Sequence, residues 1–138
     1  MTILVADDDH LMTLLLSNRL KQAGYGTLVA HDAMQAVMIA MRTQPDAILL
    51  DINMPGGTGM QVLHRLKNSV KTSLIPIIVV SASIDSAMVA AAKSAGADEY
   101  FSKPPDMDRL LSTLEGLLHP QALPKTAAAP STGCSPPE

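Results

Sequence analysis

The sequence predicts an α/β fold in which a parallel β-sheet lies between two layers of helices. Three short runs rich in Ile, Val and Leu, at residues 3–6, 47–50 and 75–80, do not alternate with polar residues. Continuous apolar runs of this length are typical of strands buried on both faces, as in parallel sheets. Residues 27–30 and 99–101 are weaker strand candidates. Segments with helical spacing separate the runs, and right-handed crossovers then place helices on both faces, which makes a three-layer αβα sandwich.

The helix expected between the first two strands is marked by leucines. Leu11, Leu14, Leu15 and Leu20 recur at helical spacing. Gly24 follows them as a C-terminal stop signal.

The later helices are marked by capping residues and apolar stripes. Asp32 followed by Gln35 resembles a capping box at the start of the second helix. Residues 60–67 and the alanine-rich residues 85–94 are the next two expected helices. Asp106 can cap the last one. The inward side chains of that helix are expected to be Leu110, Leu111, Leu114, Leu117 and Leu118.

Length, charge and cysteine content narrow the class of protein. The 138 residues fit one domain. Ten basic and thirteen acidic residues leave a net charge of −3 with no dense Lys or Arg stretch, so we expect no nucleic-acid binding. The single cysteine, Cys134, cannot form an internal disulfide, no run approaches ~20 apolar residues, and the N-terminus lacks a signal-peptide pattern. We therefore expect a cytoplasmic protein without a membrane span.

The composition changes from His119 onward. Five prolines are scattered among Ala, Ser and Thr residues, and Leu123 is the only large aliphatic residue. Such a segment cannot form a packed core. We expect a folded domain over residues 1–119 and a flexible tail or truncated linker over residues 120–138.

Polar side chains follow the expected strands at their carboxyl ends. Asp7 and Asp8 follow the first strand and Asp51 follows the third. Ser81 follows the fourth strand, and Lys103 comes shortly after the fifth. In an open α/β sheet, ligands bind outside the carboxyl ends of the strands. If these strands lie side by side, the carboxylates, hydroxyl and ammonium converge on one small crater.

Three carboxylates in one crater are tolerable only with a cation between them. Two carboxylates about 4 Å apart repel by roughly 4 kcal/mol at an effective dielectric constant near 20. All-oxygen ligation suits Mg2+. Lys103 would then face the negative oxygens of a transferred phosphoryl group, and Ser81 would offer a neutral donor. A carboxylate nucleophile, a metal, a lysine and a hydroxyl are the parts needed for phosphoryl transfer to an aspartate.

Other polar residues are weaker candidates for a site. Asp9 is expected to cap the following helix rather than to bind a metal. His10, His31, His64 and His119 share no spacing typical of zinc ligands. A zinc site is therefore not expected.

Four motifs stand at the ends of successive strands. They are Val5-Ala6-Asp7-Asp8, Asp51-Ile52-Asn53-Met54-Pro55 with Gly59, Val80-Ser81-Ala82 and Tyr100-Phe101-Ser102-Lys103-Pro104. In this order they resemble the receiver (CheY-like) domain of bacterial two-component response regulators. The resemblance covers about residues 2–118. It implies a (βα)5 flavodoxin-like fold with strand order 2-1-3-4-5.

The resemblance also implies which residues bind the phosphoryl group and the metal ion. Asp51 would be the phosphorylated residue. Asp8, Asp51 and the main-chain carbonyl of Asn53 would bind Mg2+, with Asp7 helping mainly through water.

The resemblance further implies which residues respond to phosphorylation. Ser81 and Lys103 would contact the phosphoryl group, and Tyr100 would change rotamer on activation. The peptide bond between Lys103 and Pro104 is usually cis in such domains. One small departure is Pro105, which stands where relatives often have an aromatic residue.

The resemblance implies the partners of the domain as well. The phosphoryl donor would be a histidine kinase or a phosphotransfer protein. The domain would catalyse its own phosphorylation and dephosphorylation and would not be a turnover enzyme. Its output would be a downstream effector protein or an output domain missing from this sequence, and a homodimer that depends on phosphorylation is compatible with it.

Two other classes share parts of this pattern. A haloacid-dehalogenase-like phosphatase also uses an aspartate nucleophile with Mg2+, but it carries a second aspartate where this chain has Asn53. A pseudo-receiver that binds partners without phosphorylation would be expected to lack Asp8, Asp51 or Lys103, and all three are present. A P-loop nucleotide site is excluded because no Gly-rich loop ends in Lys-Ser or Lys-Thr.

Overall fold

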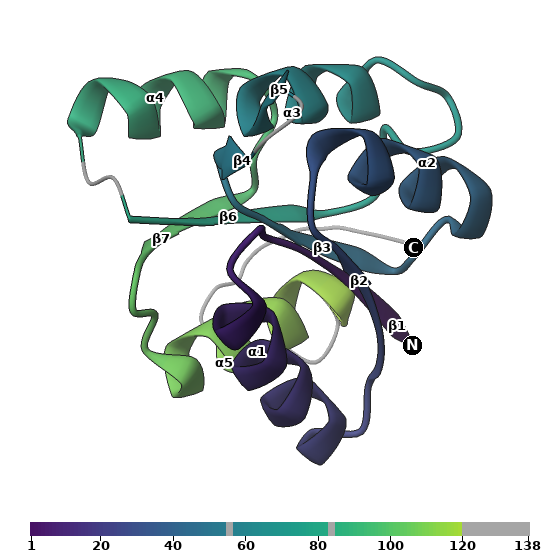
Figure 1. Ribbon diagram of the computed structural model, residues 1–138, viewed down its shortest axis with the longest axis vertical. Coiled ribbons are helices and arrows are strands. Elements are labelled where there is room, and N and C mark those ends of the chain that lie inside the picture. Colours follow the sequence, from purple (N-terminus) through teal and green to yellow (C-terminus); the bar gives the residue numbers. More distant parts are fainter. Residues whose placement is uncertain (55–56, 83–84, 120–138) are drawn as a thin grey trace, which may run out of the picture.

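Five parallel strands form the central sheet of the computed structural model, which describes residues 1–54, 57–82 and 85–119 (Figure 1). The strands are β1 (Thr2–Ala6), β2 (Gly26–Ala30), β3 (Ala47–Leu50), β6 (Ile77–Ser81) and β7 (Glu99–Ser102). Their order across the sheet is β2-β1-β3-β6-β7. Counted along the chain within this sheet, the order is 2-1-3-4-5, which confirms the expected flavodoxin-like topology. The tail expected from residue 120 onward lies outside the described residues, as do Pro55 and Gly56.

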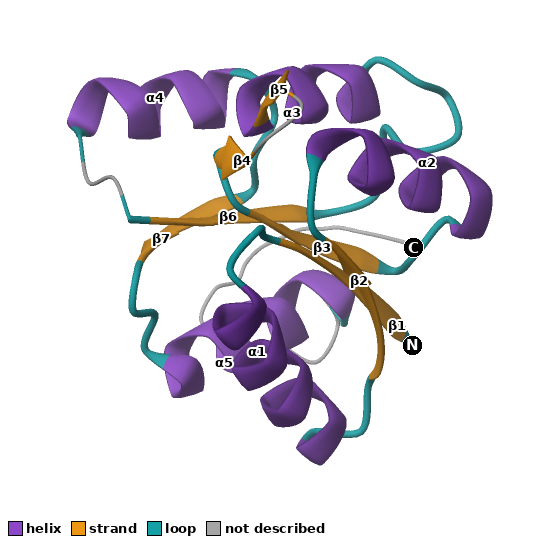
Figure 2. Cartoon of the chain, in the orientation of Figure 1, coloured by secondary structure: helices purple, strands orange, loops and turns teal. Residues whose placement is uncertain are grey.

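Helices cover both faces of the sheet, as Figure 2 shows. They are α1 (His10–Gln22), α2 (Ala33–Thr43), α3 (Gly59–Lys67), α4 (Ser86–Ser94) and α5 (Met107–Leu118). The middle three lie on one face, and α1 and α5 lie together on the other. This arrangement confirms the three-layer αβα sandwich. Over the ranges that the structure describes, no helix is both long enough and apolar enough to cross a membrane.

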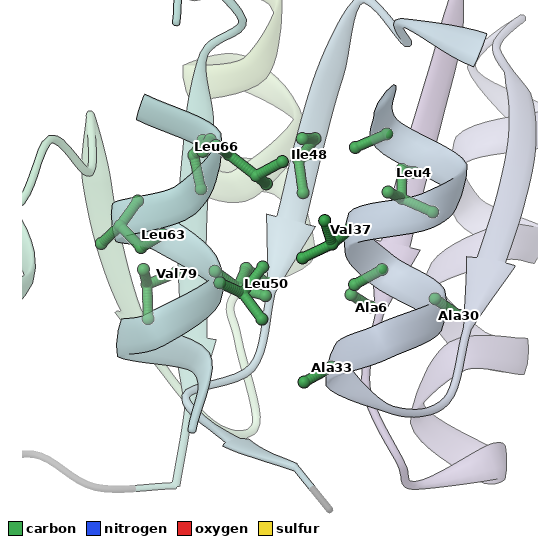
Figure 3. Packing of buried hydrophobic residues seen from close by; sticks show 14 of the residues in the cluster. Leu4, Ala6, Ala30, Ala33, Val37, Ile48, Leu50, Leu63, Leu66 and Val79 are labelled. Carbon is green, nitrogen blue, oxygen red and sulfur yellow. The ribbon is translucent and has the colours of Figure 1, made fainter. Parts of the chain in front are cut away.

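The strand residues alternate between two separate cores. On β1, Leu4 belongs to the core beneath α2 and α3, whereas Ile3 belongs to the core beneath α1 and α5. On β3, Ile48 and Leu49 divide in the same way. Figure 3 shows the first of these cores, with Val37 of α2 packed toward the sheet. Full burial of each such side chain contributes roughly 1.5 to 3 kcal/mol. The continuous apolar runs therefore stabilise the packing of helices on both faces of the sheet.

The expected capping residues begin their helices. Asp9 is the N-cap of α1 and accepts hydrogen bonds from the main-chain N–H groups of Leu11 (3.0 Å) and Met12 (3.2 Å). Asp32 and Asp106 cap α2 and α5 in the same manner. These carboxylates satisfy N–H groups that have no partner within the helix. The prediction that Asp9 is a cap is thus confirmed.

The leucines that mark α1 in the sequence do not all face the sheet. Leu11, Leu14 and Leu15 are exposed, at 64%, 56% and 46% of their surface. The buried stripe instead joins Thr13, Leu16, Ser17 and Leu20. Both sets recur at helical spacing because leucines stand at three successive positions, 14 to 16. The contacts of α1 with β1, β2 and α5 determine which set turns inward.

The strand ends differ from the expected ranges by one or two residues. Strand β6 begins at Ile77 rather than at residue 75, because Pro76 has no N–H group for the sheet. The carbonyl of Pro76 still accepts a hydrogen bond from Ile48 N–H, at 3.0 Å. The sequence patterns did not predict a short antiparallel pair, β4 (Asn53–Met54) with β5 (Gly57–Thr58). Along the chain, this pair lies between Asp51 and the beginning of α3.

Candidate functional site

The candidate site lies at the carboxyl ends of adjacent strands. Asp7 follows β1 and Asp51 follows β3, and each extends the hydrogen-bond ladder by one residue. The N–H of Asp7 donates to the carbonyl of Ala30 (3.0 Å), and the N–H of Asp51 donates to the carbonyl of Ala6 (2.9 Å). The main chain of both aspartates is therefore fixed by the sheet itself.

Three carboxylates converge at this edge of the sheet. One oxygen each from Asp7, Asp8 and Asp51 can be chosen so that all lie within 4.8 Å of one another. Asp7 and Asp51 are buried, with 2% and 5% of their surface exposed, whereas Asp8 is exposed. The predicted convergence of these acidic residues is present in the structure.

Lys103 places its ammonium group between the two buried carboxylates. Its Nζ lies 2.6 Å from Oδ2 of Asp7 and 3.2 Å from Oδ2 of Asp51. Burial alone would lower the pKa of Lys103, but the hydrogen bonds and charges of both carboxylates outweigh burial and raise that pKa. The main-chain N–H of Lys103 donates a hydrogen bond to the carbonyl of Ser81, at 2.9 Å. This bond fixes the main chain of the lysine beside the end of β6. The lysine is therefore held as a charged group in contact with both buried carboxylates.

The cluster has a charge imbalance that a divalent cation would correct. Three carboxylates face one ammonium group, so two negative charges remain in excess. Two of the acidic residues are buried, where screening by water is weak. Carboxylate oxygens, with room for water on the exposed side at Asp8, are the ligands that Mg2+ prefers. The residues present thus fit a magnesium ion.

Ser81 and Tyr100 lie on the neighbouring strands. Ser81 is the last residue of β6 and is fully buried, with 0% of its surface exposed. Tyr100 is on β7, is partly buried and packs against the core beneath α2, α3 and α4. The peptide bond between Lys103 and Pro104 is cis, as the resemblance implies. The roles of Ser81 and Tyr100 concern a phosphorylated state and remain predictions.

Asn53 follows the acidic site on the chain. Its main chain begins β4 and pairs with Thr58. Its side chain lies outside the described residues. The expected binding of Mg2+ by its main-chain carbonyl remains a prediction.

Asp7 is held at three of its oxygen atoms. Oδ1 accepts a hydrogen bond from the main-chain N–H of Asp9, at 2.9 Å, and Oδ2 takes the lysine contact. Its carbonyl oxygen lies 3.1 Å from Nδ1 of His31. His31 was not among the expected site residues, because no short spacing in the sequence links it to Asp7.

Gly59 lies in close contact with the main chain of Asp51 and Ile52. It is the first residue of α3, and its N–H donates to the carbonyl of Ile52 at 2.5 Å. A Cβ atom on Gly59 would collide with the carbonyl oxygen of Asp51 and with Cα of Ile52. Glycine is therefore needed here, because only a residue without a Cβ atom allows the first residue of α3 to approach the main chain at Asp51 this closely.

Gly59→Ala is expected to lower the free energy of unfolding by about 2 to 3 kcal/mol, because main-chain atoms around Asp51 must move to make room. Urea unfolding followed by circular dichroism measures the loss. Gly26→Ala is the matched control, since a Cβ there would meet nothing nearer than 3.5 Å and should change stability little. A loss equally small for both variants would contradict the close contact at Gly59.

Comparison with known proteins identifies relatives over most of the chain. The family model of the response regulator receiver domain matches residues 3–115. Protein PilH of Pseudomonas aeruginosa is 34% identical over 116 residues, which cover 84% of this chain and 96% of that protein. The DNA-binding dual master transcriptional regulator RpaA of Synechocystis is 34% identical over 116 residues, which cover 84% of this chain and 48% of RpaA. The chain thus spans about half the length of RpaA and nearly all of PilH.

Solved structures agree with these matches. The chemotaxis response regulator CheY4 of Vibrio cholerae superposes with a TM-score of 0.79 and has 27% sequence identity. The match covers 85% of this chain and 98% of that structure. The similarity therefore extends over the sheet and the helices on both faces.

Proposed function

The chain belongs to the family of response regulator receiver domains, and from this membership we propose that Asp51 accepts a phosphoryl group from a histidine kinase or a phosphotransfer protein. One observation carries the proposal. Asp51 is buried at the end of β3, beside Lys103 and within a cluster of three carboxylates. A buried carboxylate held next to one ammonium group, with excess negative charge around it, suits in-line attack on a phosphorus atom whose oxygens need neutralising.

The proposed step is a transfer between two nucleophiles. A carboxylate oxygen of Asp51 attacks the phosphorus of a phosphohistidine, the new O–P bond forms, and the N–P bond breaks. The imidazole of the donor leaves with the electron pair of that bond. Lys103, already within 3.2 Å of Asp51, would exchange this contact for an oxygen of the transferred group. The chain therefore acts on itself and does not turn over a substrate.

Mg2+ is the proposed cofactor of this step. Asp8, Asp51 and the carbonyl of Asn53 would hold it, and Asp7 would contribute mainly through water. When bound, the ion supplies positive charge that the cluster lacks and that the incoming phosphoryl oxygens require.

The proposed output is protein binding, either to a separate effector or through an output domain of the same protein. The relatives include PilH, which is matched over 96% of its length, and RpaA, which is matched over only 48%. RpaA is named as a DNA-binding regulator, but this chain matches only half of it. We therefore assign no nucleic-acid binding to the receiver domain itself. Phosphorylation-dependent dimerisation is a further form of output, and residues 120–138 would serve as a tail or linker.

The direct test is intact-mass spectrometry of the purified chain after incubation with Mg2+ and acetyl phosphate. We expect one phosphoryl group per chain, lost on treatment with hydroxylamine because an acyl phosphate is labile to it. Omission of Mg2+ should strongly reduce the yield. No adduct in the presence of Mg2+ with either acetyl phosphate or a phosphorylated kinase domain would contradict the proposal.

Asp8→Ala is expected to remove most of the stabilisation that Mg2+ gives. Mg2+ that binds only the folded chain raises its stability by mass action. Without metal, the same variant should be more stable than the parent, on the order of 1 kcal/mol, because one of three clustered carboxylates is gone. Thermal unfolding with and without Mg2+ measures both effects. Equal shifts with Mg2+ in parent and variant would exclude Asp8 as a ligand.

Ser81→Ala is expected to separate phosphorylation from the response. Ser81 is buried at the end of β6, and Tyr100 is partly buried on the adjacent β7. We propose that phosphorylation draws the Ser81 hydroxyl toward the phosphoryl oxygens and that Tyr100 moves into the space this leaves. Amide NMR shifts, recorded with beryllofluoride as a phosphoryl mimic, should change less over residues 85–118 in Ser81→Ala. Shifts as large as in the parent would contradict this coupling.

A further inference from the structure

Two histidines far apart in the sequence stack against each other beside the acidic site. The ring of His10, the first residue of α1, lies parallel to the ring of His31, which follows β2. The ring centroids are 3.9 Å apart and the planes differ by 13°. His10 directly follows the acidic residues 7–9, so the stack connects the beginning of α1 to the loop before α2.

The His31 ring also contacts the acidic turn itself. Its Nδ1 lies 3.1 Å from the carbonyl oxygen of Asp7. A carbonyl oxygen can only accept a hydrogen bond, so Nδ1 must carry the proton in this contact. His31 is thus a donor to the main chain of a residue whose side chain already faces Lys103.

The beginning of α2 holds His31 in place. The main-chain N–H of His31 donates to Oε1 of Gln35, at 2.9 Å. The N–H of Gln35 donates in turn to Oδ1 of Asp32, the N-cap of α2, at 2.8 Å. The ring therefore contacts Asp7 from a main chain that is held by the hydrogen bond to Gln35, next to the N-cap of α2.

We propose that His31 and His10 are positioning residues for the divalent-cation site. His31 holds the carbonyl of Asp7, and the stacked ring of His10 covers one face of the imidazole and limits its movement. Together they keep residues 7–9 in the conformation that directs the carboxylates of Asp7 and Asp8 toward Asp51. Hydrogen bonds to groups that support metal ligands raise metal affinity because they reduce the cost of ordering those ligands. This inference rests on the proposed magnesium site.

Four variants separate the hydrogen bond from the stack. His31→Phe keeps an aromatic ring but loses the donor, whereas His31→Asn keeps an N–H donor near the position of Nδ1 but loses the ring. His10→Phe keeps an aromatic partner, and His10→Ala removes it. His64→Phe is the matched control, because His64 is an exposed histidine on a different helix, α3.

The primary measurement is the dissociation constant for Mg2+, obtained by isothermal titration calorimetry at fixed pH and ionic strength. We expect His31→Phe to bind Mg2+ roughly fivefold to tenfold more weakly than the parent. His31→Asn should recover most of that loss. His10→Ala should weaken binding by about twofold to threefold, and His10→Phe and His64→Phe should match the parent.

A second measurement needs neither metal nor phosphorylation. The N–H of Asp9 donates to Oδ1 of Asp7, so its hydrogen exchange reports the order of the acidic turn. In the metal-free protein we expect this amide to exchange faster in His31→Phe than in His31→Asn or in the parent. Amides in the centre of β3 should be unchanged, which shows that the fold as a whole is intact.

The outcomes distinguish this inference from the proposed function. A parent protein that does not bind Mg2+ overturns the magnesium site and the inference together. A parent that binds Mg2+ while His31→Phe binds it equally well overturns the inference alone. The inference is also overturned if His31→Asn binds Mg2+ as weakly as His31→Phe and both variants lose folding stability in proportion to their loss of Mg2+ affinity. The histidine would then serve only the fold.

Discussion

Asp51→Asn is expected to abolish the phosphoryl adduct completely, which is the largest functional effect of any single substitution in this chain. The amide has the shape of the carboxylate but no negatively charged oxygen to attack phosphorus. Because Asp51 is buried and shares Lys103 with Asp7, the substitution also removes like charge from the cluster. The metal-free fold should therefore be retained. Intact-mass spectrometry with Mg2+ and acetyl phosphate measures the adduct.

Asp9→Asn is the matched control for Asp51→Asn. Asp9 lies beside the same cluster but caps α1, and asparagine is an equally good N-cap. This variant should be phosphorylated like the parent. An undiminished adduct in Asp51→Asn would refute the assignment of Asp51, and an adduct lost in both variants would show that the loss is not specific to Asp51.

Lys103→Met is expected to have the largest effect on stability. The lysine lies 2.6 Å from Asp7 and 3.2 Å from Asp51, and both carboxylates are nearly inaccessible to water. Removing the ammonium group leaves two buried carboxylates facing each other. The free energy of unfolding of the metal-free protein should fall by about 2 to 4 kcal/mol, as for other buried ion pairs that lose one partner. Mg2+ should recover much of this loss, because it supplies the missing positive charge.

Urea unfolding with and without Mg2+ measures the change, and Lys71→Met, at an exposed lysine, is the control. The same variant should also phosphorylate poorly, since no ammonium group would face the transferred oxygens. Metal-free stability equal to that of the parent would contradict a role for Lys103 in holding the two carboxylates.

The lysine should also make stability depend on pH at the alkaline end. The pKa of Lys103 is raised above its ordinary value of 10.5 by its carboxylate partners, against the effect of burial. Its contribution is thus complete below about pH 10.5 and is lost as the pH rises through the higher pKa of the folded state. The pKa of Tyr25 is also raised, by burial and by its hydrogen bond to Glu115, so Tyr25→Phe is the suitable background for this measurement.

Much of the site could be predicted from the sequence because parallel topology brings strand ends together. Each apolar run ends at or shortly before a polar residue, and the order of strands in the sheet makes those ends neighbours. Asp7, Asp8 and Asp51 accordingly lie within one cluster, with Lys103 beside it. The caps of α1, α2 and α5 were predictable for a similar reason, since a cap is a local interaction within a few residues.

The sequence by itself therefore determined the layers, the positions of the five parallel strands to within one or two residues, and the convergence of the acidic residues. Only the tertiary structure decided which stripe of α1 faces the sheet, why Gly59 must lack a side chain, and that His10 stacks on His31. Periodicity and capping depend on neighbours along the chain, which a sequence displays directly. These three features instead depend on atoms from segments that are adjacent only after the sheet and its helices have packed.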